Sequence, residues 1–260
     1  MFATHADQLA FVVERVASAL ERANVWHTLA YGTLLGAVRD GDIIPWDSDV
    51  DFFIRAADMR RILLLNAELA RDGIMLQRAK MVASVLAANA RGVSASSGQR
   101  LTIDHHGVRV GDLYPLSLFD DGVLRWYDFE HESYWCPDCS FPHYFMAEPA
   151  EVRLRGRAYR APRAAERWLE LVYGATWRVP FKAGDARTDD VSVWGYAFKP
   201  MLQEARAWCE AQGWDPTSYA GQPHWPRMVA AVGPAGWAPR GEDPNHVHWW
   251  KSLSQIVALY

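Results

Sequence analysis

Cysteine, long apolar runs and surplus positive charge are all scarce in this sequence of 260 residues. Only 3 cysteines are present, and an odd count without the spacing of a disulfide scaffold is typical of a reducing compartment. No stretch approaches the roughly 18 apolar residues that a membrane-spanning helix requires. The first residues also lack the basic and apolar segments of a signal peptide. We therefore expect a cytoplasmic protein with no transmembrane segment.

The charge balance restricts the class of partner. The formal net charge is -4, whereas a protein that holds a long polyphosphate backbone needs clustered lysine and arginine. Nucleic acid is therefore disfavoured as the main partner. A metal-bound nucleotide or a small anionic substrate remains compatible, because local charge can differ from net charge.

The hydrophobic pattern indicates an α+β fold. Half of the residues are hydrophobic, enough for a sizeable core. Apolar spacing predicts helices and strands in alternation, with a mixed sheet flanked by helices. We expect helices at 9–20, 34–39, 59–71, 164–173 and 193–212, strands at 25–30, 49–54 and 151–159, and a strand pair within 101–116 that turns near 106–107. The predicted catalytic core is 1–125. Residues 126–260 form a helical or irregular lobe packed on it, or continue the same domain.

Three aspartates alternate at the start of one predicted strand: Asp47, Asp49 and Asp51. Residues two apart point to the same face of a strand, so Asp49 and Asp51 would place two carboxylates side by side. Close carboxylates favour a shared cation, and hard oxygen ligands suit Mg²⁺ or Mn²⁺. The simpler alternative is a solvated polar turn. The apolar run 52–54 that follows favours the metal, and Asp47 is expected near the metal without binding it.

Further candidates flank these acids. We expect Asp112 from a neighbouring strand as the third metal ligand or the general base, against the alternative that it caps a turn. Gly32 and Thr33, between a strand and a helix, are candidates for contact with a donor phosphate. Arg39 either binds phosphate or forms a structural salt bridge with one of the acids.

The run from Tyr31 to Ile54 closely resembles the signature of the LicD family, which includes the fukutin-related proteins. That signature is Gly-Ser/Thr-Leu-Leu-Gly-Ala-x-Arg-x-Gly, followed by Ile-Pro-Trp-Asp and alternating aspartates. The segment 112–116, Asp-Leu-Tyr-Pro-Leu, is similar to a later family element, and 172–180 is similar to its Tyr-Gly-x-x-Trp-x-x-Pro element. The last eighty or so residues carry no motif that aligns.

The resemblance implies a nucleotidyltransferase fold and a divalent metal. It also implies transfer of a substituted phosphate, such as phosphocholine or a polyol phosphate, from a CDP-activated donor to a hydroxyl of a saccharide or glycolipid, with release of CMP. By position, Asp49, Asp51 and Asp112 would be the metal and catalytic carboxylates. Gly32 and Thr33 would contact donor phosphate, and Arg39 would support the site. The setting looks like that of the bacterial, cytoplasmic branch.

Other chemistry is possible elsewhere in the chain. Cys136 and Cys139, with His131 and His143 nearby, form a candidate structural zinc site, although a clear second ligand pair is missing. The segment 245–250, Asn-His-Val-His-Trp-Trp, is a weaker candidate for contact with an acceptor or a choline-like cation. His105 and His106 are expected to be exposed at a turn.

Two other functions fit the same residues. One is transfer of a nucleoside monophosphate from an NTP, which would release pyrophosphate instead of CMP. The other is a catalytically inactive nucleotide-binding module of the same fold. The intact set of acids favours an enzyme.

Overall fold

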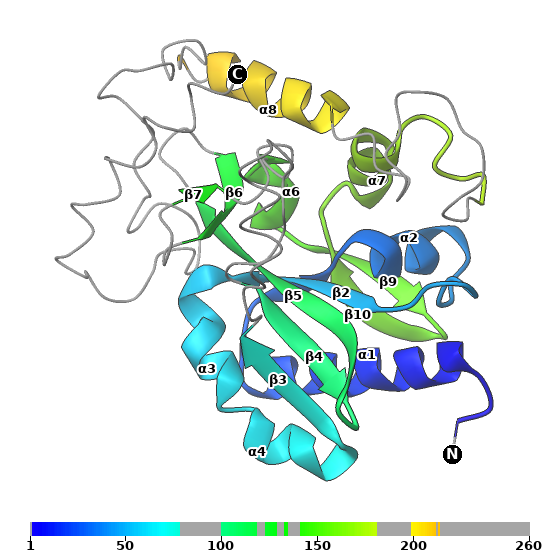
Figure 1. Cartoon of the computed structure of the whole chain (residues 1–260). Coiled ribbons are helices and arrows are strands. Elements are labelled where there is room, and N and C mark those ends of the chain that lie inside the picture. The colour runs from blue at the N-terminus through cyan, green and yellow to red at the C-terminus, as the bar shows by residue number, and fades with distance from the viewer. Residues whose placement is uncertain are drawn as a thin grey trace, which may run out of the picture.

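The computed structural model describes residues 2–78, 100–118, 123–128, 133–134, 141–180, 199–211 and 213. Their centre is a mixed β-sheet with the strand order β1-β2-β5-β4-β3 (Figure 1). Strands β2 and β5 run parallel, and the other neighbours in this order run antiparallel. The strands are β1 (His27–Leu29), β2 (Val50–Arg55), β3 (Ile74–Arg78), β4 (Leu101–His105) and β5 (Val108–Leu118).

Five further strands lie around this central order. Strand β6 pairs with the end of β5 and with β7 and β8, and β9 pairs with β10 as a separate hairpin whose β10 lies against β1. These strands are β6 (Val123–Asp128), β7 (Ser133–Tyr134), β8 (Phe141–Pro142), β9 (Ala150–Leu154) and β10 (Arg157–Ala161).

Helices cover the sheet and its edge. Short 3-10 turns at Ala56–Asp58 and Ala70–Asp72 flank the helices that connect β2 to β3. The α-helices are α1 (His5–Arg22), α2 (Tyr31–Arg39), α3 (Met59–Leu63), α4 (Asn66–Leu69), α6 (Tyr144–Ala147), α7 (Ala165–Tyr173) and α8 (Lys199–Ala211). None of these is long and apolar enough to cross a membrane.

Helix α1 begins with a capping box and presents one apolar face. The Thr4 side chain accepts a hydrogen bond from the Asp7 N–H, and the Asp7 carboxylate accepts one from the Thr4 N–H. Leu9, Val13 and Leu20 are completely buried in the core. Their spacing is that of the stripe on which the sequence prediction for this helix rests.

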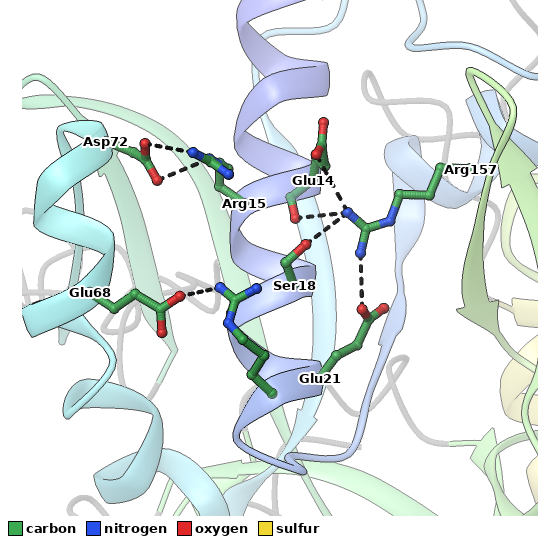
Figure 2. A network of polar contacts seen from close by, with 8 residues as sticks. Glu14, Arg15, Ser18, Glu21, Glu68, Asp72 and Arg157 are labelled. Atoms are coloured by element: carbon green, nitrogen blue, oxygen red, sulfur yellow. Dashed lines mark hydrogen bonds and ion pairs between the residues drawn. The ribbon is translucent and has the colours of Figure 1, made fainter.

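The exposed side of α1 joins two parts of the fold that are distant in sequence (Figure 2). On one flank, Arg15 pairs with Asp72 at 2.9 Å. On the other flank, Arg157 at the start of β10 donates to the Ser18 hydroxyl at 2.8 Å and pairs with Glu21 at 3.0 Å. The helix therefore holds the β9–β10 hairpin and the segment before β3 on opposite sides.

The alternation along β2 separates the two faces of the sheet. Residues two apart share a face, so Asp51 and Phe53 point the same way. The Phe53 ring packs 5.2 Å from the ring of Tyr31 in α2 and 5.6 Å from that of Trp168 in α7. Asp51 therefore lies on the face that α2 and α7 cover.

The structure confirms most predicted elements and corrects others. The strand pair within 101–116 is present as β4 and β5. The predicted helix at 59–71 is wrong as one element, because it is divided into α3, α4 and a 3-10 turn. The predicted strand at 151–159 is a hairpin, with Arg155 and Gly156 at its turn in the left-handed region of φ. The division of the chain near residue 125 stays a prediction.

The prediction that His105 and His106 are both exposed is wrong for His105. His106 is exposed at the β4–β5 turn, but His105 is only 2% exposed. Its Nδ1 lies 2.8 Å from Gln8 Nε2, and its ring packs against Phe11 at 5.9 Å. The strand places His105 against α1, so it is a buried packing residue.

Candidate active site

Two neighbouring carboxylates and a third from a distant segment meet at one edge of the parallel strand pair. Asp51 in β2 is the register partner of Asp112 in β5, and Asp49 directly precedes β2. One oxygen of each of the three side chains lies within 4.8 Å of the other two. Among the described residues, this is the only such group of potential metal ligands. The geometry brings together the three acids that the sequence singles out.

The backbone of Asp51 is fixed by the start of α2. The Ala30 N–H donates to the Asp51 carbonyl at 3.0 Å, and the Asp51 N–H donates to the Thr33 hydroxyl at 2.9 Å. Thr33 is only 2% exposed, so its side chain supports Asp51 from inside the protein. The contact of Thr33 with donor phosphate, expected from the family resemblance, stays a prediction.

Burial and mutual repulsion make this carboxylate cluster costly to ionise. Burial raises the pKa of Asp51 well above its usual value, and the charges of Asp49 and Asp112 raise it further. The pKa of Asp49 is also raised, first by burial and then by Asp112. Buried Asp51 Oδ1 has no hydrogen-bond partner among the described residues. A divalent cation would satisfy this oxygen and remove the repulsion, so the site fits such an ion.

Gly32 leaves room for a fourth carboxylate. A Cβ atom at Gly32 would lie 2.6 Å from Asp47 Oδ2, so this glycine lets the Asp47 side chain approach the first turn of α2. Burial and the charge of Asp49 raise the pKa of Asp47 to about 6. Asp47 is absent from the group of three, and its place near a metal stays a prediction.

Two arginines that the sequence analysis does not single out contact the third carboxylate. Arg100 Nε lies 3.2 Å from Asp112 Oδ1, and the Arg109 guanidinium pairs with Asp112 Oδ2. The Tyr114 hydroxyl also donates to Asp112 Oδ2 at 3.3 Å. In the sequence, these arginines stand out only because both lie within twelve residues of Asp112. Such proximity is too common to predict a contact.

Arg39 and the candidate zinc ligands are the remaining predicted site residues. The Arg39 side chain is only 7% exposed and pairs with Asp40 at 2.7 Å, so its salt-bridge partner is none of the clustered acids. His143 lies directly before α6, whereas Cys136, Cys139 and His131 lie outside the described residues. The zinc site therefore stays a prediction, as does the role of 245–250.

The part of the chain that contains the carboxylate cluster matches a known protein family. The sequence model of the family described as "LicD/FKTN/FKRP, nucleotidyltransferase domain" matches residues 24–164. That range includes all three clustered carboxylates, both arginines on Asp112 and the start of α2.

Two curated relatives are similar in sequence to part of this chain. "Ribitol 5-phosphate transferase FKRP" of Homo sapiens is 30% identical over 162 residues, and the Mus musculus protein of the same name matches equally. The match covers 61% of this chain and 30% of each relative. The chain therefore corresponds to about a third of the length of these relatives.

Two solved structures resemble the chain distantly. They are the lincosamide antibiotic adenylyltransferase LnuA bound to lincomycin, with a TM-score of 0.40, and ANT(2")-Ia in complex with adenylyl-2"-tobramycin, with a TM-score of 0.42. Each is 15% identical in sequence. The matches cover 76% and 79% of this chain, and 96% and 98% of those chains. Similarity at this level says nothing of the substrate.

Proposed function

Since the chain belongs to the LicD/FKTN/FKRP family of nucleotidyltransferase domains, we propose that it is a metal-dependent transferase. It moves a substituted phosphate, phosphocholine or a polyol phosphate, from a CDP-activated donor to a hydroxyl of a saccharide or glycolipid. The observation that carries the proposal is the cluster of Asp49, Asp51 and Asp112. The name of the human and mouse relatives favours a ribitol phosphate donor group.

In this proposal Asp49 and Asp51 hold Mg²⁺ or Mn²⁺, and Asp112 is either the third ligand or the general base. Bound there, the ion would neutralise charge on the phosphate oxygens as the phosphoryl group is transferred. The Asp51 backbone is held by hydrogen bonds with Ala30 and Thr33, so the point from which its carboxylate extends is fixed. A rigid ligand requires little rearrangement when donor binds, which favours catalysis.

The reaction itself exchanges one phosphorus–oxygen bond for another. The oxygen of the acceptor hydroxyl bonds to the donor's β-phosphorus, and the bond from that phosphorus to the bridging oxygen breaks, so that CMP leaves. A base takes the hydroxyl proton, and Asp112 is the proposed base if it does not act as the third ligand. Gly32 and Thr33, in the first turn of α2, are proposed to donate backbone N–H groups to donor phosphate, since helix N-termini favour anions.

Product analysis tests the proposal. The chain is incubated with CDP-ribitol, CDP-glycerol, CDP-choline, CTP or ATP, each with Mg²⁺, Mn²⁺ or EDTA and a saccharide acceptor. We expect CMP from one CDP conjugate only when a divalent ion is present, and none from Asp51→Asn. Release of pyrophosphate from an NTP would instead indicate nucleotidyl transfer. Turnover that survives in both Asp49→Asn and Asp51→Asn would contradict the assigned site.

A further inference from the structure

A break in strand pairing brings Arg109 to the carboxylate cluster. Along β4 and β5, Ile103 pairs with Gly111 and Asp104 pairs with Arg109, so Val110 is an extra residue on β5. In a regular strand, residues three apart point to opposite faces. The bulge reverses this alternation, and the Arg109 guanidinium reaches Asp112 Oδ2. Bulges near active sites commonly redirect a side chain in this way.

The two arginines on Asp112 differ in exposure. The Arg100 side chain is 12% exposed, whereas that of Arg109 is 46% exposed. Arg100 is therefore enclosed by the fold. Arg109 lies on the open side of the cluster, where its long side chain can exchange Asp112 for a group that arrives from solvent.

Arg109 lies beside the whole cluster through its contact with Asp112. The carboxylate that its guanidinium pairs with belongs to the group in which one oxygen of each acid lies within 4.8 Å of the other two. A ligand that binds an ion held by these acids would therefore lie near the Arg109 guanidinium. A guanidinium presents paired N–H donors that match two phosphate oxygens.

A divalent ion changes the charge balance around this guanidinium. With Asp47 beside the three clustered acids, four carboxylates and two guanidiniums carry a net charge of -2, which a divalent cation neutralises. The ion then neutralises Asp112 in place of Arg109, and the guanidinium is available to a donor phosphate.

We propose that Arg109 is a donor-phosphate-binding residue, which pairs with Asp112 in the free protein and turns to the diphosphate when a divalent ion and the donor bind. This inference rests on the proposed function, because it takes a metal-bound cytidine diphosphate as the ligand. It adds a residue that contacts substrate and that lies outside the aspartate signature.

Separate measurements of ion binding and nucleotide binding test the inference. Mn²⁺ alone is titrated by electron paramagnetic resonance, and CDP is titrated calorimetrically in saturating Mn²⁺. In Arg109→Gln we expect Mn²⁺ to bind at least as tightly as in wild type, because a nearby positive charge is removed. CDP should bind roughly 10-fold more weakly or worse, because charge-assisted hydrogen bonds are lost. Arg109→Lys should fall between the two.

Arg15→Gln is the matched control, because Arg15 is 44% exposed and pairs with an aspartate away from the cluster. It should bind Mn²⁺ and CDP as wild type does. Unchanged CDP affinity in Arg109→Gln, or an equal loss of Mn²⁺ and CDP binding, would overturn the inference, since the second result would mean that Arg109 only positions Asp112. Arg109→Lys decides in the same way if Arg109→Gln fails to fold. Absence of Mn²⁺-dependent CDP binding in wild type would instead contradict the proposed function.

Discussion

At the scale of single residues, Thr33 has a structural role where the sequence predicts contact with donor phosphate. Its hydroxyl accepts the Asp51 N–H at 2.9 Å inside the protein. Thr33→Val keeps the shape and removes the acceptor, so a buried N–H is left without its partner. We expect a loss of about 1–3 kcal/mol in the free energy of unfolding, together with weaker Mn²⁺ binding.

Denaturant unfolding and Mn²⁺ titration of Thr33→Val measure both effects. Thr33→Ser is the control, because it retains the hydroxyl and should recover the Mn²⁺ affinity. If Thr33→Val binds Mn²⁺ like wild type, the Thr33 hydroxyl does not position Asp51 for the ion.

A second prediction concerns Gly32, where a larger residue would displace the Asp47 side chain and leave the backbone in place. In Gly32→Ala the new methyl group would meet the end of the Asp47 side chain, which can rotate away. We expect stability within about 1 kcal/mol of wild type, since alanine favours helix, but a clear loss of CMP release. Thermal unfolding and product assays separate the two effects. Full activity in Gly32→Ala would show that the position of Asp47 does not matter.

The raised pKa values of Asp47, Asp49 and Asp51 predict how ion binding depends on pH. These groups hold their protons more tightly when folded, so without a divalent ion they stabilise the fold most at low pH. The contribution of Asp47 is lost as the pH rises through its pKa of about 6, and those of Asp49 and Asp51 are lost as the pH rises through their own raised pKa values. Deprotonation at the same time makes the carboxylates better ligands, so stabilisation by Mn²⁺ should grow from pH 5 to 7.5.

The measurement is the difference in melting temperature with and without Mn²⁺ at each pH. The difference is needed because other groups also make stability depend on pH. Burial lowers the pKa of His27, so His27 makes the fold more stable as the pH rises, opposite to the three aspartates. Asp51→Asn is the control and should show a small difference at every pH. A Mn²⁺ effect that does not change with pH would contradict the raised pKa values.

At the scale of elements, alternation and spacing predict the strands but not their irregularities. The acids at 49 and 51 and the strand pair around residue 106 are visible in the sequence because period-two patterns and Gly107 mark them. The bulge at Val110 is not, and regular alternation would place Arg109 on the face opposite Asp112. This is why the three carboxylates are predicted and the arginine beside them is missed.

The helical prediction for 59–71 fails for a related reason. Its apolar spacing suits one helix, but Asn66 turns inward and bonds twice to the backbone of Leu76 in β3, at 2.7 and 2.8 Å. This tertiary contact accompanies the division into α3 and α4. A local pattern does not contain the position of β3, so periodicity alone cannot predict the break.

The turn of the β9–β10 hairpin contacts the loop that precedes the clustered aspartates. At its turn, the Arg155 N–H donates to the Gly41 carbonyl at 2.8 Å, and its guanidinium pairs with Asp42 at 2.5 Å and Asp7 at 2.7 Å. The hairpin thereby holds the loop that leads to the aspartates. Because these pairs are partly exposed, Arg155→Gln should cost only about 1 kcal/mol of stability, yet should lower CMP release.

Urea unfolding and the product assay test this. Arg167→Gln is the control, because Arg167 pairs with Glu170 at 3.0 Å at a distance from the loop, and it should retain activity. Equal activity in the two variants would show that the hairpin contact does not support the site.

At the scale of the whole molecule, one hydrophobic core joins the site to its surroundings. It includes Val13 of α1, Phe53 of β2, Phe141 of β8 and Trp168 of α7. Residues on both sides of position 125 therefore pack together in the described part of the chain. The carboxylate cluster lies where the parallel strands β2 and β5 enter this core, and the core keeps their register.

Binding of Mn²⁺ to the whole chain, followed by electron paramagnetic resonance in wild type and Asp51→Asn, tests the metal centre most directly. We expect one ion per chain in wild type. In the variant, the affinity should be lowered roughly 10-fold or more, while its melting temperature without metal is retained or raised. The last point follows because replacing an acid relieves repulsion among the buried carboxylates. Equal Mn²⁺ affinity in the two proteins, or no binding in wild type, would contradict the claim that these aspartates form a metal centre.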